Sequence, residues 1–510
     1  MNGGLITAEC LSRGWHSAVP VWHKDNMGDD TSNAFLDAAA GLLGPRGLTR
    51  DGQIMEPWLT DWRGRYTGRA LALASPASTQ EVAALVALCA QHRVPIVPQG
   101  GNSGMSGGAT PDDSGQALLL SLRRMDAIRS VDEDARQVVC EAGVVLQTLH
   151  DHAAARGLRF PLTLGGKGSA TVGGLVSTNA GGTQVLRHGA MRSQVLGLEA
   201  VLPDGTILDT LAALKKDNRG FDLKQVLIGS EGTLGVVTAA TLALLPQIAA
   251  RRVLFVGISS VQQARRLLLL ADARLGDALE GFEIMPRDAL DAVLAYEPTA
   301  RDPLGGRHEW YALLELVADE TQAGSLEERA TGLLEDALGR ELVEDATIAA
   351  SESQAEALWA LRDGISSAER AHGPAVQHDI SVPTEKMPDF IDAASAQLER
   401  QFPGTHAIAF GHLGDGNVHF HLRAPEGAQG GAWEAGEGKA VSAAVHDLVT
   451  QWGGSISAEH GIGQMKRDEL ERLADPAALT ILRGVKQALD PLGIMNPGKL
   501  VPLASRAPAA

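Results

Sequence analysis

Two glycine-rich stretches constrain the fold of this chain more than any other feature. The first is Pro98-Gln99-Gly100-Gly101-Asn102-Ser103-Gly104-Met105, which follows an apolar run at 94–97 that is typical of a short buried strand. The second, LGGKGSATVGGLVSTNAGG, spans residues 164–182. Glycine leaves backbone N–H groups uncovered, so each loop can turn tightly and direct several donors at one anion. Two such loops predict a ligand with two phosphates.

The common phosphate-binding motifs do not match either stretch. A dinucleotide fingerprint needs Gly-x-Gly-x-x-Gly, but Thr171 stands where a third glycine should follow Gly166 and Gly168. A Walker loop needs Ser or Thr directly after Gly-Lys, and here Gly168 follows Lys167. For one stretch alone, ordinary turns are an equal alternative. For both together, the diphosphate interpretation is favoured.

Composition narrows the classes of partner. Lys and Arg number 44 and Asp and Glu number 62 among 510 residues, so the net charge is −18. This balance argues against nucleic acid, whose phosphates require clustered cations, and it allows a small anionic substrate only where a local pocket is basic. Cys10, Cys89 and Cys140 form no disulfide or zinc pattern, so we expect a cytoplasmic location. We also expect no transmembrane segment and no signal peptide.

The pattern of expected elements changes near Arg251. Before it, strands and helices suggest two α/β lobes, each presenting one glycine-rich loop. After it, strands and helices alternate at a spacing typical of an antiparallel sheet covered on one face, as in ferredoxin-like folds. We therefore predict a poorly ordered extension at 1–26, a first domain at 27–248, a second at 249–460 and a C-terminal helical segment at 461–510.

The segment GHLGDGNVHFH at 411–421 predicts part of a metal site. Asp415-Gly416 is a strong signal for a two-residue hairpin turn. Closing the turn there places His412 opposite His419, and directly opposite residues have Cβ atoms about 4.5–5.5 Å apart. Two imidazoles at that separation can reach one divalent ion. His421 lies two residues further on and shares the face of His419.

A third ligand is offered by SAEHGIG at 457–463. Glu459 would complete a site of two histidines and one carboxylate that keeps open positions, as a catalytic metal requires. The alternative is that these histidines are separate surface or core residues, which is the favoured interpretation for any one of them taken alone.

These segments together resemble a known family. They are similar to the FAD-linked oxidoreductases of the vanillyl-alcohol-oxidase type, which have a PCMH-type FAD-binding domain, and most of all to the D-2-hydroxyglutarate and the D-lactate or glycolate dehydrogenases. Further matching segments are RHGAMRSQVLGLEAVLPDG at 187–205, KDNRGFDLKQVLIGSEGTLGVVT at 216–238 and DPLGIMNPGK at 490–499. The resemblance runs from about residue 55 to about residue 502.

The resemblance implies an α+β fold with three parts. These are a two-lobed PCMH-type FAD-binding domain, a ferredoxin-like antiparallel-sheet substrate (cap) domain and a C-terminal helical segment that returns to the FAD domain. It implies FAD, held non-covalently because positions 98–108 contain no histidine. The implied FAD contacts are Pro98, Gln99, Gly100, Gly101, Asn102, Ser103, Gly104, Met105, Gly165, Gly168, Ser169, Gly173, Gly174, Thr178, Ala180, Glu231, Gly235, Val237 and Asn496.

The resemblance also assigns roles near the metal. It implies that His412, His419 and Glu459 bind a divalent metal, with zinc as the first choice, and that His460 is the catalytic base. The implied substrate-binding positions are Arg362, Ser366, Gln377 and His421. Gln377 stands where the hydroxyglutarate enzymes have a lysine, and His421 where they have an asparagine. The loss of a cation favours a less acidic substrate side chain, unless a protonated His421 compensates in part.

The implied reaction is oxidation of a D-2-hydroxy acid to the 2-oxo acid. The substrate would be D-2-hydroxyglutarate, D-lactate or a related acid. The metal would lower the pKa of the hydroxyl group, His460 would take its proton, Arg362 would orient the carboxylate, and the hydride would pass to flavin N5. An electron-transfer flavoprotein or a quinone would reoxidise the flavin, and a homodimer is compatible with the resemblance. The alternatives are a metal-dependent hydrolase and a non-catalytic flavin-binding subunit of a glycolate-oxidase-like complex.

Overall fold

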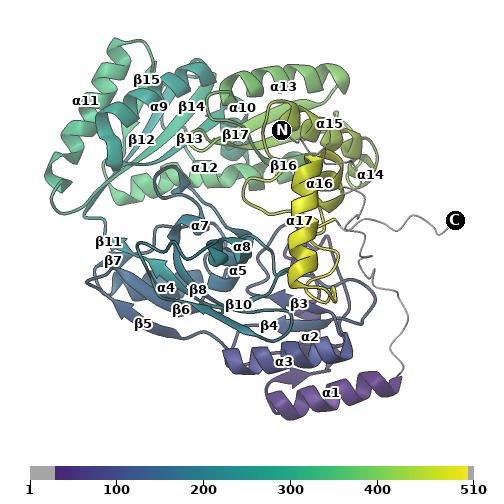
Figure 1. Ribbon diagram of the computed structural model, residues 1–510. Helices are drawn as coiled ribbons and strands as arrows, with labels where there is room; N and C mark the ends of the chain where they lie inside the picture. The colour runs from purple at the N-terminus through teal and green to yellow at the C-terminus, as the bar shows by residue number, and fades with distance from the viewer. Residues whose placement is uncertain (1–28, 503–510) are drawn as a thin grey trace, which may run out of the picture.

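The computed structural model describes residues 29–502, so the predicted extension at 1–26 lies outside the described residues. The chain forms two parts (Figure 1). The lower part holds the N-terminal half and the C-terminal helices, and the upper part is built on one large sheet. The α+β class is confirmed, because both parts combine helices with sheets, and the two largest sheets are antiparallel.

The first sheet of the lower part carries the first glycine-rich loop. Its strands lie in the order β1 (Leu48–Thr49), β2 (Ala72–Ala74), β4 (Leu118–Ser121) and β3 (Ile96–Gln99). Around it lie α1 (Asp29–Leu43), α2 (Gly52–Met55), η2 (Glu56–Trp58) and α3 (Thr79–His92). Helix α3 begins where the Ser78 hydroxyl accepts the Glu81 N–H at 3.1 Å, as a helix cap does. The loop leaves the carboxyl end of β3.

The second sheet of the lower part is antiparallel. Its order is β5 (Ile128–Asp132), β6 (Gln137–Glu141), β10 (Val236–Ala243), β8 (Val195–Val201) and β9 (Ile207–Thr210). The associated elements are α4 (Leu146–Ala154), β7 (Leu158–Arg159), α5 (Val172–Thr178), α6 (Val185–His188), α7 (Met191–Gln194), α8 (Leu223–Leu227) and β11 (Leu245–Pro246). The second glycine-rich stretch lies between β7 and α6 and includes α5. Both loops therefore belong to the same part of the molecule.

The upper part contains a fully antiparallel seven-stranded sheet. Its order is β15 (Asp345–Ile348), β12 (Ala250–Ile258), β14 (Trp310–Ala318), β13 (Leu279–Pro286), β17 (His406–His412), β18 (Asn417–Arg423) and β16 (Ala375–Ser381). One face packs under α9 (Val261–Leu275), α11 (Leu326–Gly339), α13 (Met387–Gln401) and α15 (Glu437–Gln451). The other packs in part on α10 (Arg287–Tyr296) and α12 (Glu352–His372). The expectation of a sheet covered on one face is thus wrong, because α10 and α12 bury a second apolar cluster. The short elements η3 (Gly276–Ala278), η4 (Ala323–Ser325) and α14 (Ala432–Ala435) complete this part.

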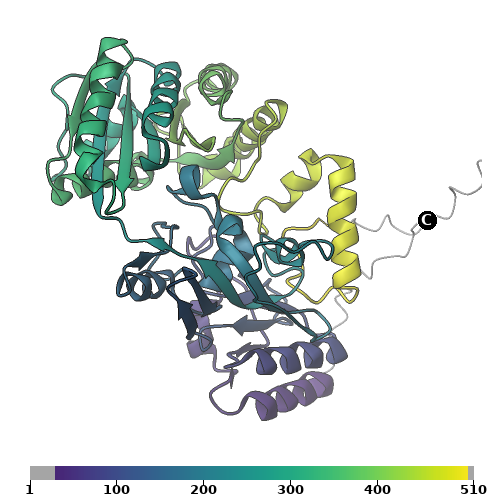
Figure 2. The ribbon, with the colours of Figure 1, turned by 60° about the vertical axis from the view of Figure 1, so that its left-hand side comes forward.

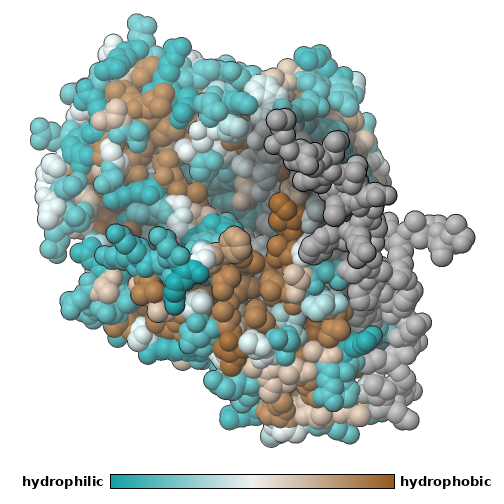
Figure 3. Space-filling view, in the orientation of Figure 1, coloured by the Kyte–Doolittle hydropathy of each residue, from teal (hydrophilic) through white to brown (hydrophobic). Residues whose placement is uncertain are grey.

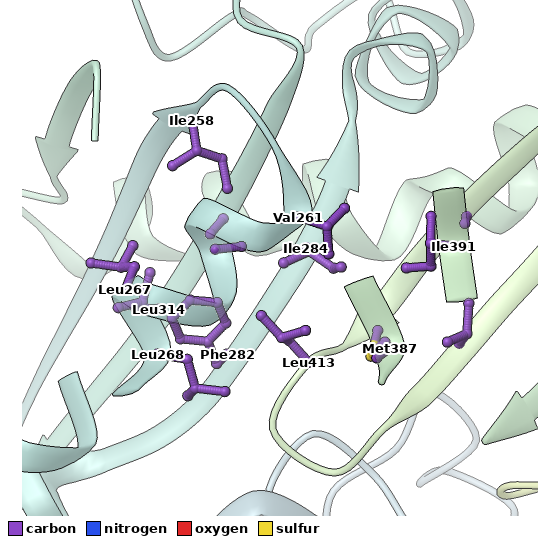
Figure 4. Packing of buried hydrophobic residues seen from close by; sticks show 14 of the residues in the cluster. Ile258, Val261, Leu267, Leu268, Phe282, Ile284, Leu314, Met387, Ile391 and Leu413 are labelled. Atoms are coloured by element: carbon purple, nitrogen blue, oxygen red, sulfur yellow. The ribbon is translucent and has the colours of Figure 1, made fainter. Parts of the chain in front are cut away.

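Alternation along the central strands separates the face of the larger core from the opposite face, called the polar face below, which carries charged groups beside the second apolar cluster. In β13, Phe282 and Ile284 belong to the larger core (Figure 4), whereas Glu283 between them points to the opposite face. In β18, Val418 and Phe420 likewise enter that core, and His419 lies on the other side. A one-residue slip would put the charged groups into the apolar core, so the burial of this face fixes the strand register.

The C-terminal segment joins the upper sheet back to the lower part. After α16 (Arg467–Leu473) and α17 (Pro476–Leu489), the chain forms a parallel bridge between Ile96 and Met495. The buried Lys486 ammonium donates to the carbonyls of Thr233 and Met495, both at 2.7 Å. Figure 2 shows these helices beside the lower part. The predicted domain boundaries stay predictions.

Two surface properties complete the description. In the space-filling view, hydrophilic residues cover much of the upper part, and apolar residues gather toward the middle of the face shown (Figure 3). Within residues 29–502, no helix combines the length and the apolar character that crossing a membrane requires.

We predict that Phe282→Ala destabilises the upper part. The ring is 1% exposed in the larger core, so its removal should leave a cavity and cost about 3–5 kcal/mol of the free energy of unfolding. Urea denaturation followed by circular dichroism measures this loss. Leu338→Ala is the control, because that side chain is 44% exposed and its removal should have little effect. Equal losses for both variants would contradict the assignment of the core.

Candidate functional site

The three predicted metal ligands come together on the polar face of the upper sheet. One ligand atom from each of His412, His419 and Glu459 lies within 4.8 Å of the others. The two imidazole rings are 5.5 Å apart between centroids, and His412 Nε2 lies 3.9 Å from Glu459 Oε1. These distances allow one divalent ion to contact all three side chains.

The hairpin that carries the histidines has a different register from the predicted one. His412 lies opposite Asn417, and Phe410 lies opposite His419. The turn spans residues 413–416 because the Gly416 N–H donates to the His412 carbonyl at 3.2 Å, with Gly416 at φ +82°. The prediction of a two-residue turn was therefore wrong. The two histidines are diagonal neighbours on one face, which long side chains still bridge.

A buried carboxylate that the motifs did not indicate orients His412. Glu283 is fully buried and lies opposite His412 on the neighbouring strand. Its Oε1 lies 2.5 Å from His412 Nδ1, and its Oε2 accepts from Arg362 Nε at 2.8 Å. Contact through Nδ1 leaves Nε2 facing Glu459, as in carboxylate–histidine–metal arrangements.

The charges around Glu283 stabilise one another. Burial alone would raise the pKa of Glu283, but His412 and Arg362 together lower it to about 2. Burial alone would lower the pKa of His412, but the Glu283 carboxylate raises it to about 9. Burial also raises the pKa of Glu459 to about 7, although its side chain retains 23% exposure. A cation at the cluster would favour the charged form of Glu459.

A second buried carboxylate, Asp379, holds the loop that carries Glu459 and His460. Its Oδ2 accepts the backbone N–H groups of both residues at 2.9 Å and lies 3.3 Å from His460 Nδ1. Its Oδ1 accepts from Asn417 Nδ2 at 2.9 Å. Although burial opposes the charged form, His460 and Lys466 hold the pKa of Asp379 well below its usual range. Burial lowers the pKa of His460, so its imidazole is a proton acceptor near neutrality.

Weak sequence signals for both carboxylates existed. Glu283 is a charged residue in the middle of an apolar strand, and Asp379 shares a strand face with Gln377 by its period-two spacing. Neither signal identifies a partner, because the partners lie far away in the chain.

The two glycine-rich loops meet in the lower part. A Cβ at Gly101 would overlap the Ser169 carbonyl oxygen, and one at Gly100 would overlap the Thr171 hydroxyl. Next to this contact, ideal Cβ positions at Gly104 and Gly168 have no atom within 4 Å. The N–H groups from Gly101 to Gly104 donate to no other residue between 29 and 502. Close backbone approach, open space and free donors together fit the diphosphate of FAD.

Several residues predicted to contact FAD have structural partners as well. The Gln99 amide donates to the carbonyls of Trp58 and Ala109, and the Asn102 amide donates to that of Thr60. The Asn496 amide donates to Gly108 and Glu231, with φ +41° at Asn496. The Thr178 hydroxyl donates to Gly174 within α5. Ala180 and Val237 belong to the core of the second sheet, Gly173 packs on Ala142, and Gly235 packs on Val201.

Glu231 joins the lower part to the loop that carries the candidate base. Its carboxylate accepts the N–H groups of Ile462 and Gly463, both at 2.7 Å. The Ser106 hydroxyl donates to the His460 carbonyl at 3.0 Å, and an ideal Cβ at Gly181 lies 3.6 Å from Glu459 Oε1. The glycine-rich loops and the metal cluster therefore adjoin, although they belong to different parts.

The predicted substrate positions surround the same face. The Arg362 Nε donates to Glu283, and the Arg362 Cζ lies 5.2 Å from the centroid of the Phe410 ring. Ser366 follows one helical turn later and is half-buried. Gln377 lies opposite His421 on the neighbouring strand. Burial and nearby arginines lower the pKa of His421 to about 3, so the imidazole is neutral. This lowered pKa argues against the alternative in which a protonated His421 compensates for the missing lysine.

We predict that Gly101→Ala weakens retention of FAD. The added Cβ has no room beside the Ser169 carbonyl, so the two loops must separate. The FAD content of the purified protein, measured by absorbance after denaturation, should fall several-fold. Gly41→Ala is the matched control, since nothing lies within 4 Å of its ideal Cβ in α1. Unchanged FAD content in Gly101→Ala would contradict the assignment of the loop.

Comparison with known families gives matches over most of the chain. A profile described as "FAD binding domain" matches residues 70–211. A second, described as "FAD linked oxidases, C-terminal domain", matches residues 248–500. The first covers both glycine-rich loops, and the second covers the metal cluster.

Similar proteins include several that are named as dehydrogenases. The chain is 35% identical over 464 residues to a mitochondrial D-2-hydroxyglutarate dehydrogenase of Arabidopsis thaliana, covering 90% of this chain and 80% of the relative. It is 33% identical over 497 residues to a putative mitochondrial D-lactate dehydrogenase of Schizosaccharomyces pombe, covering 94% and 92%. A D-2-hydroxyglutarate dehydrogenase of Xanthomonas citri is 35% identical over 447 residues, covering 88% and 92%.

Solved structures share the fold at lower identity. A substrate-bound p-cresol methylhydroxylase has a TM-score of 0.72 and 15% identity, covering 93% of this chain and 97% of that one. An alkyldihydroxyacetonephosphate synthase has a TM-score of 0.68 and 17% identity, covering 91% and 84%. These likenesses concern the arrangement of the chain.

Proposed function

This chain belongs to the FAD-linked oxidases, and from that premise we propose that it oxidises a D-2-hydroxy acid to the 2-oxo acid with the help of a divalent metal. The observation that carries the proposal is the position of the His412–His419–Glu459 cluster beside the glycine-rich loops. An oxidation of this kind needs a hydride acceptor and a group that activates the hydroxyl at one place. The chain offers sites for both.

The donor set fits a catalytic divalent metal. Two imidazoles and one carboxylate leave coordination positions open, and zinc suits this set of nitrogen and oxygen ligands. Glu283 holds the ring of His412, and Asp379 holds the backbone of Glu459, so both ligands are fixed before any ion binds. A metal bound there would supply Lewis-acid polarisation of the substrate hydroxyl.

His460 is positioned to take the hydroxyl proton. Its Nδ1 faces the Asp379 carboxylate, which leaves Nε2 as the proton acceptor. Asp379 acts as a positioning residue that also stabilises the resulting imidazolium. When bound, FAD supplies the acceptor for the hydride from C2.

Arg362 is suited to bind the substrate carboxylate. Its Nε is occupied by Glu283, which fixes the orientation of the guanidinium. The two terminal nitrogens make no hydrogen bond to any residue that the structure describes. They can therefore present a planar pair of donors to a carboxylate.

The two alternatives account for less of the site. A hydrolase would not need the paired glycine-rich loops beside the metal cluster. A non-catalytic flavin-binding subunit would not need Glu283 and Asp379 to orient a ligand and a base. We retain an electron-transfer flavoprotein or a quinone as the proposed acceptor, and a cytoplasmic location as a further proposal.

Activity is tested with a panel of D- and L-2-hydroxy acids added anaerobically to the purified flavoprotein. We expect flavin bleaching and turnover with an artificial electron acceptor for one enantiomer, because the positions of His460 and Arg362 are fixed. We expect that enantiomer to be the D acid, as the names of the relatives indicate for those proteins. Bleaching by no acid of the panel would overturn the proposed reaction.

Removal of the metal tests the role of the cluster. Glu459→Gln removes a ligand charge without changing side-chain size, so we predict at least a 100-fold loss of turnover and a loss of bound zinc with unchanged FAD. Metal analysis and flavin absorbance measure both contents. Glu426→Gln, in an exposed loop of the same part, is the control. Full activity after complete chelation would rule out a metal-assisted step.

A further inference from the structure

We propose that Arg63, with Arg65 and Arg370 beside it, is a specificity-determining residue that binds a second carboxylate at the far end of a dicarboxylic substrate. This inference rests on the proposed function for the position of the reacting carbon. It adds a substrate contact from the lower part, which sequence motifs did not indicate.

Arg63 reaches the polar face of the sheet from the other part of the molecule. Its Nη1 donates to Gln377 Oε1 at 3.2 Å, across 314 residues of sequence, and its Nη2 lies 3.6 Å from Met105 Sδ. Gln377 lies opposite His421 and shares the face of Asp379. Arg63 therefore lies where the first glycine-rich loop, the sheet and the metal-bearing strand meet.

A short loop presents this side chain. Asp61 accepts the backbone N–H groups of Arg63 and Tyr66, at 3.2 Å and 2.6 Å. The Thr60 carbonyl accepts from Asn102 of the first glycine-rich loop at 2.8 Å. The loop is thus fixed to the predicted cofactor site, which makes the position of Arg63 well defined.

The three arginines lack acidic partners. In the described part of the chain, none of Arg63, Arg65 and Arg370 forms an ion pair, whereas neighbouring Arg362 and Arg423 pair with Glu283 and Glu369. The Arg63 Nε is buried without a hydrogen-bond partner, as is His421 Nδ1. Burial and repulsion by Arg65 and Arg370 lower the pKa of Arg63 to about 10, so it is still charged at neutral pH.

An anionic group would compensate this local excess of positive charge. The protein carries a net charge of −18, so a cluster of unpaired cations is unlike its surface as a whole. The cluster supplies the local positive charge that an anionic substrate requires in such an acidic chain.

The strand geometry gives the direction in which the substrate side chain would extend from the metal cluster. His419 and His421 are one same-face step apart, about 6.6–6.8 Å along a strand. A substrate with its hydroxyl at the metal cluster and its first carboxylate on Arg362 would extend a second carboxylate toward Gln377 and Arg63. The loss of a lysine at Gln377 therefore does not imply a less acidic substrate, because Arg63 donates to the same position.

The test compares Arg63→Gln with wild type on D-2-hydroxyglutarate and on D-lactate. Losing a charged hydrogen bond should lower kcat/KM about 10-fold to 100-fold for the dicarboxylate and change it less than about 2-fold for D-lactate. Arg63→Lys should recover part of the lost kcat/KM, and Arg370→Gln should also lower kcat/KM for the dicarboxylate. Arg46→Gln, at an exposed position of the lower part, is the control. Equal losses for both acids, or none for either, would overturn the inference.

A binding measurement separates this inference from the proposed reaction. Titration of the holoenzyme with 2-oxoglutarate and with pyruvate, followed through flavin absorbance, reports affinity without turnover. The protein could bind 2-oxoglutarate in a way that depends on Arg63 and yet oxidise no hydroxy acid. That result would support the role of Arg63 and reject the proposed oxidation. Oxidation of D-lactate by a protein that neither binds 2-oxoglutarate nor oxidises D-2-hydroxyglutarate would reject the role of Arg63 and leave the reaction standing. If Arg63→Gln does not retain FAD, the same comparison of dicarboxylate with monocarboxylate is made with Arg370→Gln and Arg63→Lys.

Discussion

The buried carboxylate of Glu283 is the interaction on which the site depends. An unpaired ion at that depth would cost several kcal/mol. Glu283 avoids this cost by contacting His412 on one oxygen and Arg362 on the other. The same contacts place a candidate metal-ligating nitrogen on β17 and a guanidinium on α12 in a fixed relation. Removing Glu283 would therefore disturb a proposed ligand and a proposed substrate contact at once.

Buried carboxylates recur as the connectors between distant segments. Asp379 accepts the backbone N–H groups of Glu459 and His460, and Glu231 of the lower part accepts those of Ile462 and Gly463 in the same loop. Each accepts several hydrogen bonds, which is how a buried charge is tolerated. The candidate base thus lies on a loop held from both parts, next to the glycine-rich stretches.

The sequence motifs identified the candidate ligands, but they did not predict the geometry that brings these residues together. His412, His419 and Glu459 were recognisable as residue types in glycine-flanked segments, and the structure brings them together. The hairpin register was not predictable from Asp415-Gly416, because the backbone bond from Gly416 to His412 favours a longer turn. The protonation state of His421 was equally unpredictable from the sequence, because burial and the surrounding arginines lower the pKa of its imidazole.

The sequence by itself determined the local chemistry of this protein. It determined two loops with uncovered N–H groups, alternating polar and apolar residues in the strands of the sheet, and a histidine-rich hairpin. Only the tertiary structure decided which groups face one another. Glu283 meets His412 across 129 residues, Asp379 meets Glu459 across 80, and Arg63 meets Gln377 across 314. Such pairs depend on the packing of whole elements, and no local propensity or spacing encodes them.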